Sequence, residues 1–102
     1  MSNNTQTTPI TGTSCMGGLE ITYSIDTSTN TITTSLNFDG LDLGSGTMTP
    51  EQPKQAIWKN TGMQIFSGEL TADYTDSKLE CQFEISEFGK IIYQNRETVA
   101  RW

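Results

Sequence analysis

The sequence predicts an all-β fold: a small antiparallel β-sandwich, or a partly open barrel, of about seven to eight short strands. Apolar and polar residues alternate along 19–26 and along 31–39, and the same alternation returns along 70–74 and 79–86. A period of two is typical of strands that have one buried and one solvated face. Turn-forming residues separate these runs, which is the pattern of hairpins.

Length and composition agree with one small β domain. The chain has 102 residues, and only 33% of them are hydrophobic. Threonine and serine, rather than charged residues, make up for the low hydrophobic fraction, and threonine suits the solvated face of a strand. Residues 1–14 are polar and are interpreted as a flexible tail, or as an edge segment that orders on contact. Residues 15–102 form the single predicted domain.

Glycines and turn dipeptides divide the domain into strands. Gly17-Gly18 precedes the first strand and Asp39-Gly40 is a strong turn signal. Gly44-Ser45-Gly46 indicates a bulge or a crossing between sheets, and Gly68 indicates a second bulge. The predicted strands are about 19–26, 31–39, a short one within 41–48, 63–74, 79–86, 90–93, and a last one that ends at Trp102 after a turn at Asn95-Arg96.

Residues 49–62 admit two interpretations. Thr49-Pro50-Glu51-Gln52 has the form of a helix start, which predicts one short helical turn near 50–60. Pro53 opposes a helix, since it stands where the helix would continue. The favoured alternative is a hairpin in which 56–59 pairs with 63–66 across a turn at 60–62.

The alternation also predicts which side chains are buried. Cys81 lies on the apolar side of its strand and is expected to be a buried thiol. A Cys15–Cys81 disulfide is the alternative in an oxidising compartment. The residues expected in the core are Tyr23, Ile25, Leu36, Phe38, Phe83 and Ile85, and those expected on the surface are Glu20, Thr22, Thr33, Glu80 and Glu84.

Charge and hydropathy exclude several classes of partner. The net charge is −6, and the basic residues are scattered singly, which disfavours nucleic acid and anionic lipid. No stretch is apolar enough for a membrane span. The N-terminus has no signal-peptide pattern, so the sequence predicts a cytoplasmic protein, or one released by a non-classical route.

The residue types present disfavour catalysis. The chain has no histidine, which removes the commonest general base and the commonest metal ligand. Glu80 and Glu84 share a strand face about 13 Å apart, too far for a glycosidase pair. We therefore expect a non-enzymatic protein without a cofactor and without a metal site.

The candidate binding residues are polar and aromatic side chains at turns: Trp58, Asn60, Asp39 and Asp42. They predict a carbohydrate- or surface-recognition module. The alternative is a protein-interaction or structural subunit that uses a sheet edge and an acidic face.

Two further surfaces extend these hypotheses. A hydroxyl face is expected on the first hairpin, made of Thr22, Ser24, Thr31, Thr33, Ser35 and Asn37. Apolar bulk near the C-terminus, in Ile91, Ile92, Tyr93, Val99 and Trp102, predicts a homodimer through residues 90–102.

Overall fold

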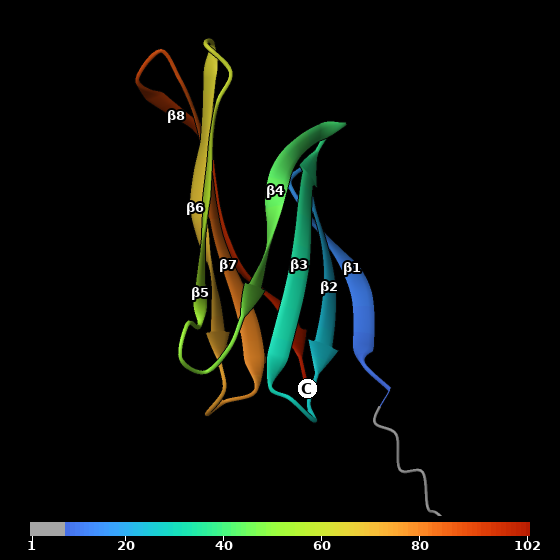
Figure 1. Ribbon diagram of the computed structural model, residues 1–102. Coiled ribbons are helices and arrows are strands. Elements are labelled where there is room, and N and C mark those ends of the chain that lie inside the picture. Colours follow the sequence, from blue (N-terminus) through green and yellow to red (C-terminus); the bar gives the residue numbers. More distant parts are fainter. Residues whose placement is uncertain (1–7) are drawn as a thin grey trace, which may run out of the picture.

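A computed structural model describes residues 8–102 and confirms the all-β class. It contains eight antiparallel strands in two four-stranded sheets, and within each sheet the strands that follow one another along the chain are paired (Figure 1). We call β1–β4 sheet 1 and β5–β8 sheet 2. The strands are β1 (Ile10–Met16), β2 (Leu19–Asp26), β3 (Thr31–Phe38), β4 (Leu41–Met48), β5 (Lys54–Asn60), β6 (Gln64–Asp73), β7 (Lys78–Glu87) and β8 (Lys90–Arg101).

The two sheets stack face to face and bury the apolar side of each strand between them (Figure 1). On β7, Leu79, Cys81, Phe83 and Ile85 are buried, while the intervening residues are partly or fully exposed. The predicted faces are therefore correct. Burial of Ile25, Leu36, Phe83 and Ile85 is confirmed, whereas Tyr23 and Phe38 are only half-buried and pack against the core. Glu80 and Glu84, which were expected on the surface, are also half-buried.

Aromatic rings join the two sheets at one end of the sandwich. The ring centroids of Phe38 on β3 and Phe66 on β6 are 5.1 Å apart, and those of Phe38 and Phe83 are 6.1 Å apart. Tyr93 on β8 completes this cluster, with its ring 6.3 Å from that of Phe83. Such pairs add about 0.5–1.5 kcal/mol each beyond the burial of their area.

Hydrogen bonds tie the sheets together elsewhere. The buried hydroxyl of Thr34 on β3 donates to the side-chain carbonyl oxygen of Gln55 on β5. At the far end, the Tyr74 hydroxyl lies within hydrogen-bond distance of two backbone carbonyl oxygens of sheet 1, 2.9 Å from Asn30 and 3.1 Å from Met48. The bond to Gln55 satisfies the buried Thr34 hydroxyl, which would otherwise be costly to bury.

The favoured hairpin forms, and the predicted helical turn near 50–60 is wrong. The predicted register is also wrong, because 56–59 pairs with 66–69 and not with 63–66. Thr49 and Gln52 exchange backbone hydrogen bonds of 3.1 and 3.0 Å, which close a tight turn instead of starting a helix. β5 then pairs with β6 along its whole length, from Lys54 opposite Thr71 to Asn60 opposite Ile65. The pairing gives the backbone of 54–60 partners that a short helix interrupted at Pro53 would lack.

Of the two interpretations of the N-terminal segment, the structure agrees with the edge segment for residues 10–14 and not with the flexible tail. These residues belong to β1, an edge strand that pairs with β2 from Ile10 opposite Ile25 to Met16 opposite Leu19. The β-branched threonines of this segment suit a strand that is solvated on one face. Residues 1–7 of the predicted tail lie outside the described residues.

The structure differs from the sequence-based predictions at two places, the turn expected at Asn95-Arg96 and the bulge expected at Gly68. β8 runs through Asn95 and Arg96 without the predicted turn, and its irregularities lie opposite Leu79/Glu80 and Ile85/Ser86. The pairing of β6 with both of its neighbours is regular at Gly68, so no bulge lies there. Glycine is required at this position because a Cβ would overlap the backbone carbonyl oxygen of Gln82. Of the bulge or crossing predicted around 44–46, the structure has a bulge one residue earlier: Leu36 pairs with Gly44 and Asn37 with Asp42, so Leu43 is the extra residue, and β4 continues unbroken to Met48.

Both cysteines are free thiols, and Cys81 is buried as predicted while Cys15 is exposed. Burial raises the pKa of the Cys81 thiol from its ordinary value of 9.0 to about 12, and the negative charge of Glu97 adds to the rise. A raised pKa means that the folded protein disfavours the thiolate that the unfolded chain forms freely.

The free energy of unfolding is therefore expected to fall as pH rises from about 9 to 12. Over that range the unfolded chain loses a proton that folded Cys81 keeps, at about 1.4 kcal/mol per pH unit, and below pH 9 the effect is absent. Urea unfolding at pH 8 and pH 10.5 measures it, with Cys81→Ala as the control whose pH dependence is flatter. Equal pH dependence in both proteins would show that this thiol titrates normally.

Candidate binding surfaces

Trp58 and Asn60 lie on the outer face of sheet 2. Ile57 is buried, so its neighbour Trp58 points away from the core, and this residue is 64% exposed. Asn60, two residues further on, shares this face, and its side-chain oxygen accepts a hydrogen bond of 2.8 Å from the backbone N–H of Gly62. Trp58 therefore presents a free ring, whereas the side-chain oxygen of Asn60 already supports the turn.

Asp39 and Asp42 belong to sheet 1 and do not join Trp58. Asp39 occupies a turn with a positive φ of 49°. Asp42 is paired with Asn37 on the outer face of sheet 1, and its Oδ1 accepts a hydrogen bond of 2.8 Å from the backbone N–H of Gly44. Because the outer faces of the two sheets point in opposite directions, the four predicted residues do not form one site.

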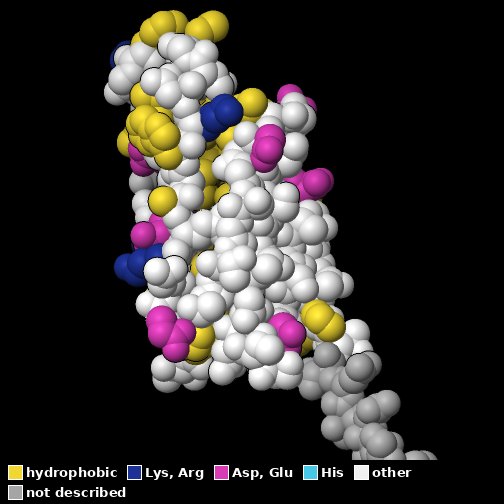
Figure 2. Space-filling model, in the orientation of Figure 1, with side chains coloured by type: hydrophobic (Ala, Val, Ile, Leu, Met, Phe, Trp, Pro, Cys, Tyr) yellow, Lys and Arg dark blue, Asp and Glu magenta, His cyan; other side chains and the backbone are white. Residues whose placement is uncertain are grey.

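Exposed apolar side chains gather at one end of sheet 2. Six large hydrophobic side chains are exposed in residues 8–102, and five of them lie near the β5–β6 and β7–β8 turns. Both turns are at the same end, because Gln64 pairs with Glu87. This end projects beyond sheet 1 (Figure 1) and carries hydrophobic atoms on its surface (Figure 2). We call it the apolar tip: Trp58, Met63, Phe88, Ile91 and Ile92.

Phe88 holds an unusual position within the apolar tip. The β3–β4 turn places Asp39-Gly40 at φ values of 49° and 89°, and the β7–β8 turn places Phe88-Gly89 at 52° and 80°. Two positive φ values are the pattern of a type I′ turn, which prefers asparagine, aspartate or glycine. A bulky residue there costs about 1–2 kcal/mol, yet 79% of Phe88 is exposed. The folded monomer gains little from this ring.

Pairing irregularities bring Ile91 and Ile92 to the apolar tip. Ile85 pairs with Tyr93 and Ser86 pairs with Ile91, which leaves Ile92 as the extra residue of a bulge. Both isoleucines are more than half exposed. The other apolar residues predicted near the C-terminus pack inward: Tyr93 and Val99 lie against the core, and the ring of Trp102 is 5.9 Å from that of Tyr74.

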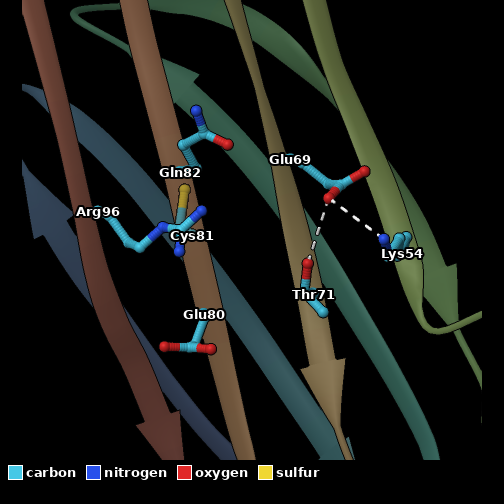
Figure 3. Close-up of a pocket in the computed structure, with 7 residues that line it drawn as sticks. All are labelled: Lys54, Glu69, Thr71, Glu80, Cys81, Gln82 and Arg96. Carbon is cyan, nitrogen blue, oxygen red and sulfur yellow. Dashed lines mark hydrogen bonds and ion pairs between the residues drawn. The ribbon is translucent and has the colours of Figure 1, made fainter.

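A hollow of about 260 Å³ lies over the strands of sheet 2 and is lined mostly by charged and polar side chains (Figure 3). Glu69 is 3.8 Å from Lys54 and accepts a hydrogen bond of 3.4 Å from Thr71. Glu80, on the neighbouring strand, is 3.8 Å from Lys78. Both carboxylates are partly exposed and paired with lysines. A buried general acid, which glycoside hydrolysis requires, would need a drier environment.

Comparisons with known protein families, with curated proteins and with solved structures find no match. Within residues 8–102, no group of three or more histidine, cysteine or acidic side chains is placed to hold a metal ion. The same residues contain no helix that is long and apolar enough to cross a membrane.

The sequence identified Trp58, Ile91 and Ile92 individually but not the apolar tip as a surface. Met63 and Phe88 were assigned to strand and turn positions, and nothing local to them signals exposure. They lie at the same end of sheet 2 only because the β5–β6 and β7–β8 hairpins end side by side.

Proposed function

We propose that this protein is a non-enzymatic interaction module, that the apolar tip is its contact surface, and that the partner is a second copy of the chain. The observation that carries the proposal is Phe88, a bulky ring held exposed in a turn conformation that opposes it. Strained, exposed residues persist where function requires them. Aromatic side chains are also the commonest anchors of protein interfaces.

Local charge supports a second copy as the partner. The whole chain carries −6, which would repel a copy of itself. Residues 58–66 and 84–93, which form the projecting end, hold two lysines and two glutamates: Lys59, Lys90, Glu84 and Glu87. This end is therefore locally neutral, and a two-fold arrangement can place each lysine near a glutamate of the other copy.

The size of the apolar tip also fits a dimer contact. A standard interface covers about 800 Å² on each partner. Phe88 and Trp58 have side chains that bury roughly 150–250 Å² each when covered, and three aliphatic side chains flank them. These residues supply the apolar centre of such an interface, and the surrounding polar residues supply the rim.

Ile91→Lys is expected to weaken self-association at least about tenfold, since it places an unpaired charge in the centre of the contact. Analytical ultracentrifugation at protein concentrations from about 1 to 200 µM measures the dimer dissociation constant. This range includes the micromolar dissociation constants that are expected of a modest interface. The matched control is Ile10→Lys, the same substitution at the exposed isoleucine of β1, at the opposite end of the sandwich. It should dimerise like the wild type.

A second variant separates association from folding. Phe88→Asn removes the ring and places a residue suited to positive φ, so the variant should be more stable to urea by about 1 kcal/mol and should dimerise less. A wild-type mass of one chain across the whole range would refute the second copy as partner. So would dimers that both Ile91→Lys and Phe88→Asn leave intact.

The second candidate function is carbohydrate binding, and the exposed indole of Trp58 supports it. A flat ring on an open sheet face is suited to stacking against a sugar. A glycan array with the wild type and Trp58→Ala distinguishes the two functions. Binding to a glycan that is lost in Trp58→Ala, by a protein that stays monomeric, would favour the carbohydrate module.

A further inference from the structure

Hydroxyl side chains form a regular array on the outer face of sheet 1. Each of its four strands contributes at least two such residues separated by one position, and the strand pairing aligns eight of them into two rows. The rows are Thr11–Ser24–Thr33–Thr47 and Thr13–Thr22–Ser35–Ser45. We call these eight residues the hydroxyl grid.

The hydroxyl grid faces solvent and carries no charge. Its strand neighbours Ile21, Ile25, Ile32 and Leu36 are buried, so the grid points outward, and seven of its members are exposed while Ser24 is half-buried. The acidic residues of this face lie beyond the two rows, with Glu20 and Asp42 at one end and Asp26 at the other. In Figure 2 the surface over β3 is uncharged except near the strand ends. A neutral area of this extent is notable in a chain of net charge −6.

The chemistry of the hydroxyl grid suits a neutral surface of alternating donors and acceptors. A hydroxyl group donates one hydrogen bond, accepts two and rotates to fit its partner. Within the described residues, one hydrogen bond joins two grid hydroxyls, that of 3.5 Å between Thr13 and Thr22. An open hollow of about 270 Å³ lies over the centre of the grid, lined by residues that include Thr22 and Thr33.

The spacing of the hydroxyl grid is that of a lattice. Neighbouring strands are about 4.8 Å apart, and residues two positions apart along a strand are separated by about 6.8 Å. These distances are close to the repeats between oxygen atoms on the prism faces of ordinary ice. From the spacing, the neutrality and the hydroxyl chemistry together, we propose that the hydroxyl grid binds the surface of ice, with its hydroxyls replacing lattice waters and the threonine methyl groups seated between them.

A single sugar fits the hydroxyl grid less well. Sites for small polar ligands are concave and combine a few oriented polar groups with apolar or aromatic walls. The two rows contain no carboxylate, amide or aromatic ring, and the hollow over them is open. Charge matching also favours ice over charged polymers, since ice presents none.

The twist of the sheet sets the expected strength of ice binding. Adjacent strands rotate by roughly 20° relative to each other, so a flat lattice fits the central strands β2 and β3 better than β1 and β4. We therefore expect inhibition of ice recrystallisation and faceted ice crystals, with only a small depression of the freezing point.

The test measures ice recrystallisation and ice-crystal shape with the full chain. The wild type should inhibit recrystallisation, and Thr33→Lys, at the centre of the hydroxyl grid, should need at least about a tenfold higher concentration, the equivalent of one or two lost hydrogen bonds. Thr98→Lys is the matched control: it makes the same change at an exposed threonine of β8, outside the grid. It should behave like the wild type. Circular dichroism checks that all three proteins are folded.

Three outcomes would overturn the proposal. The wild type could leave ice growth unchanged at millimolar concentration, or Thr33→Lys could inhibit as well as the wild type. Alternatively, the wild type could bind insoluble cellulose in a way that Thr33→Lys abolishes, without any effect on ice, which would assign the grid to a polysaccharide. Apolar-tip variants such as Ile91→Lys should retain the ice activity, because the tip belongs to the other sheet.

Discussion

Gly68→Ala is expected to destabilise the protein by about 3 kcal/mol, the upper end of the cost of overpacking a core. The reason is steric: a Cβ at this position would overlap the backbone carbonyl oxygen of Gln82 on the paired strand β7. Backbone cannot swing aside as a side chain can, so the β6–β7 ladder must separate at its centre. Urea unfolding followed by circular dichroism gives the change in the free energy of unfolding.

The matched control for Gly68→Ala is Gly44→Ala. Gly44 also lies in a strand with positive φ, but a Cβ there would meet nothing within 4 Å. Gly44→Ala therefore carries only the backbone cost, about 1 kcal/mol. If the two variants lose the same stability, the close approach of β6 and β7 at Gly68 is not what requires glycine there.

Phe83→Ala is expected to cost about 3–5 kcal/mol, a large share of the 5–15 kcal/mol that is typical for a domain. Phe83 is fully buried, and its ring centroid lies 6.1 Å from Phe38, 6.3 Å from Phe66 and 6.3 Å from Tyr93. Removing it leaves a cavity where the two sheets are joined by aromatic contacts. We expect either a strong fall in the urea midpoint or an unfolded protein at 25 °C.

Phe88→Ala makes the same chemical change at the other phenylalanine of this hairpin. Phe88 is exposed in a turn and contributes little to the core, so its removal should change stability by less than about 0.5 kcal/mol. The pair of variants separates burial from residue type. Equal losses at Phe83 and Phe88 would contradict the described core.

Local pattern was sufficient to identify the four central strands. β2, β3, β6 and β7 each pair on both sides and bury one face, so their sequences alternate cleanly. The edge strands were harder to identify because one side of each lacks a backbone partner and their side chains are less buried. The region of β1 was interpreted as either a tail or an edge segment, and a helical turn stayed open beside the favoured hairpin in the region of β5. β8 was divided by a turn that does not exist.

Alternation along single strands also predicted part of the hydroxyl face. Thr22, Ser24, Thr33 and Ser35 were placed together from the first hairpin alone, and the other two predicted members, Thr31 and Asn37, lie on the same face beyond the two rows, opposite Asp26 and Glu20. Extending the face to β1 and β4 needed two further pairings. The sequence did not decide whether Trp58 is buried or exposed, because a tryptophan on a short strand fits a core as well as a surface.

By itself, then, the sequence determined the class of fold, the inward face of each central strand and the burial of Cys81, since period-two alternation is a local property of the chain. The tertiary structure alone decided the separation of Trp58 from Asp42, the gathering of the apolar tip and the alignment of the hydroxyl grid. Those arrangements depend on which strands pair, in which register and on which side of the sandwich. Contacts between residues distant in the chain leave no periodic signal in a single sequence.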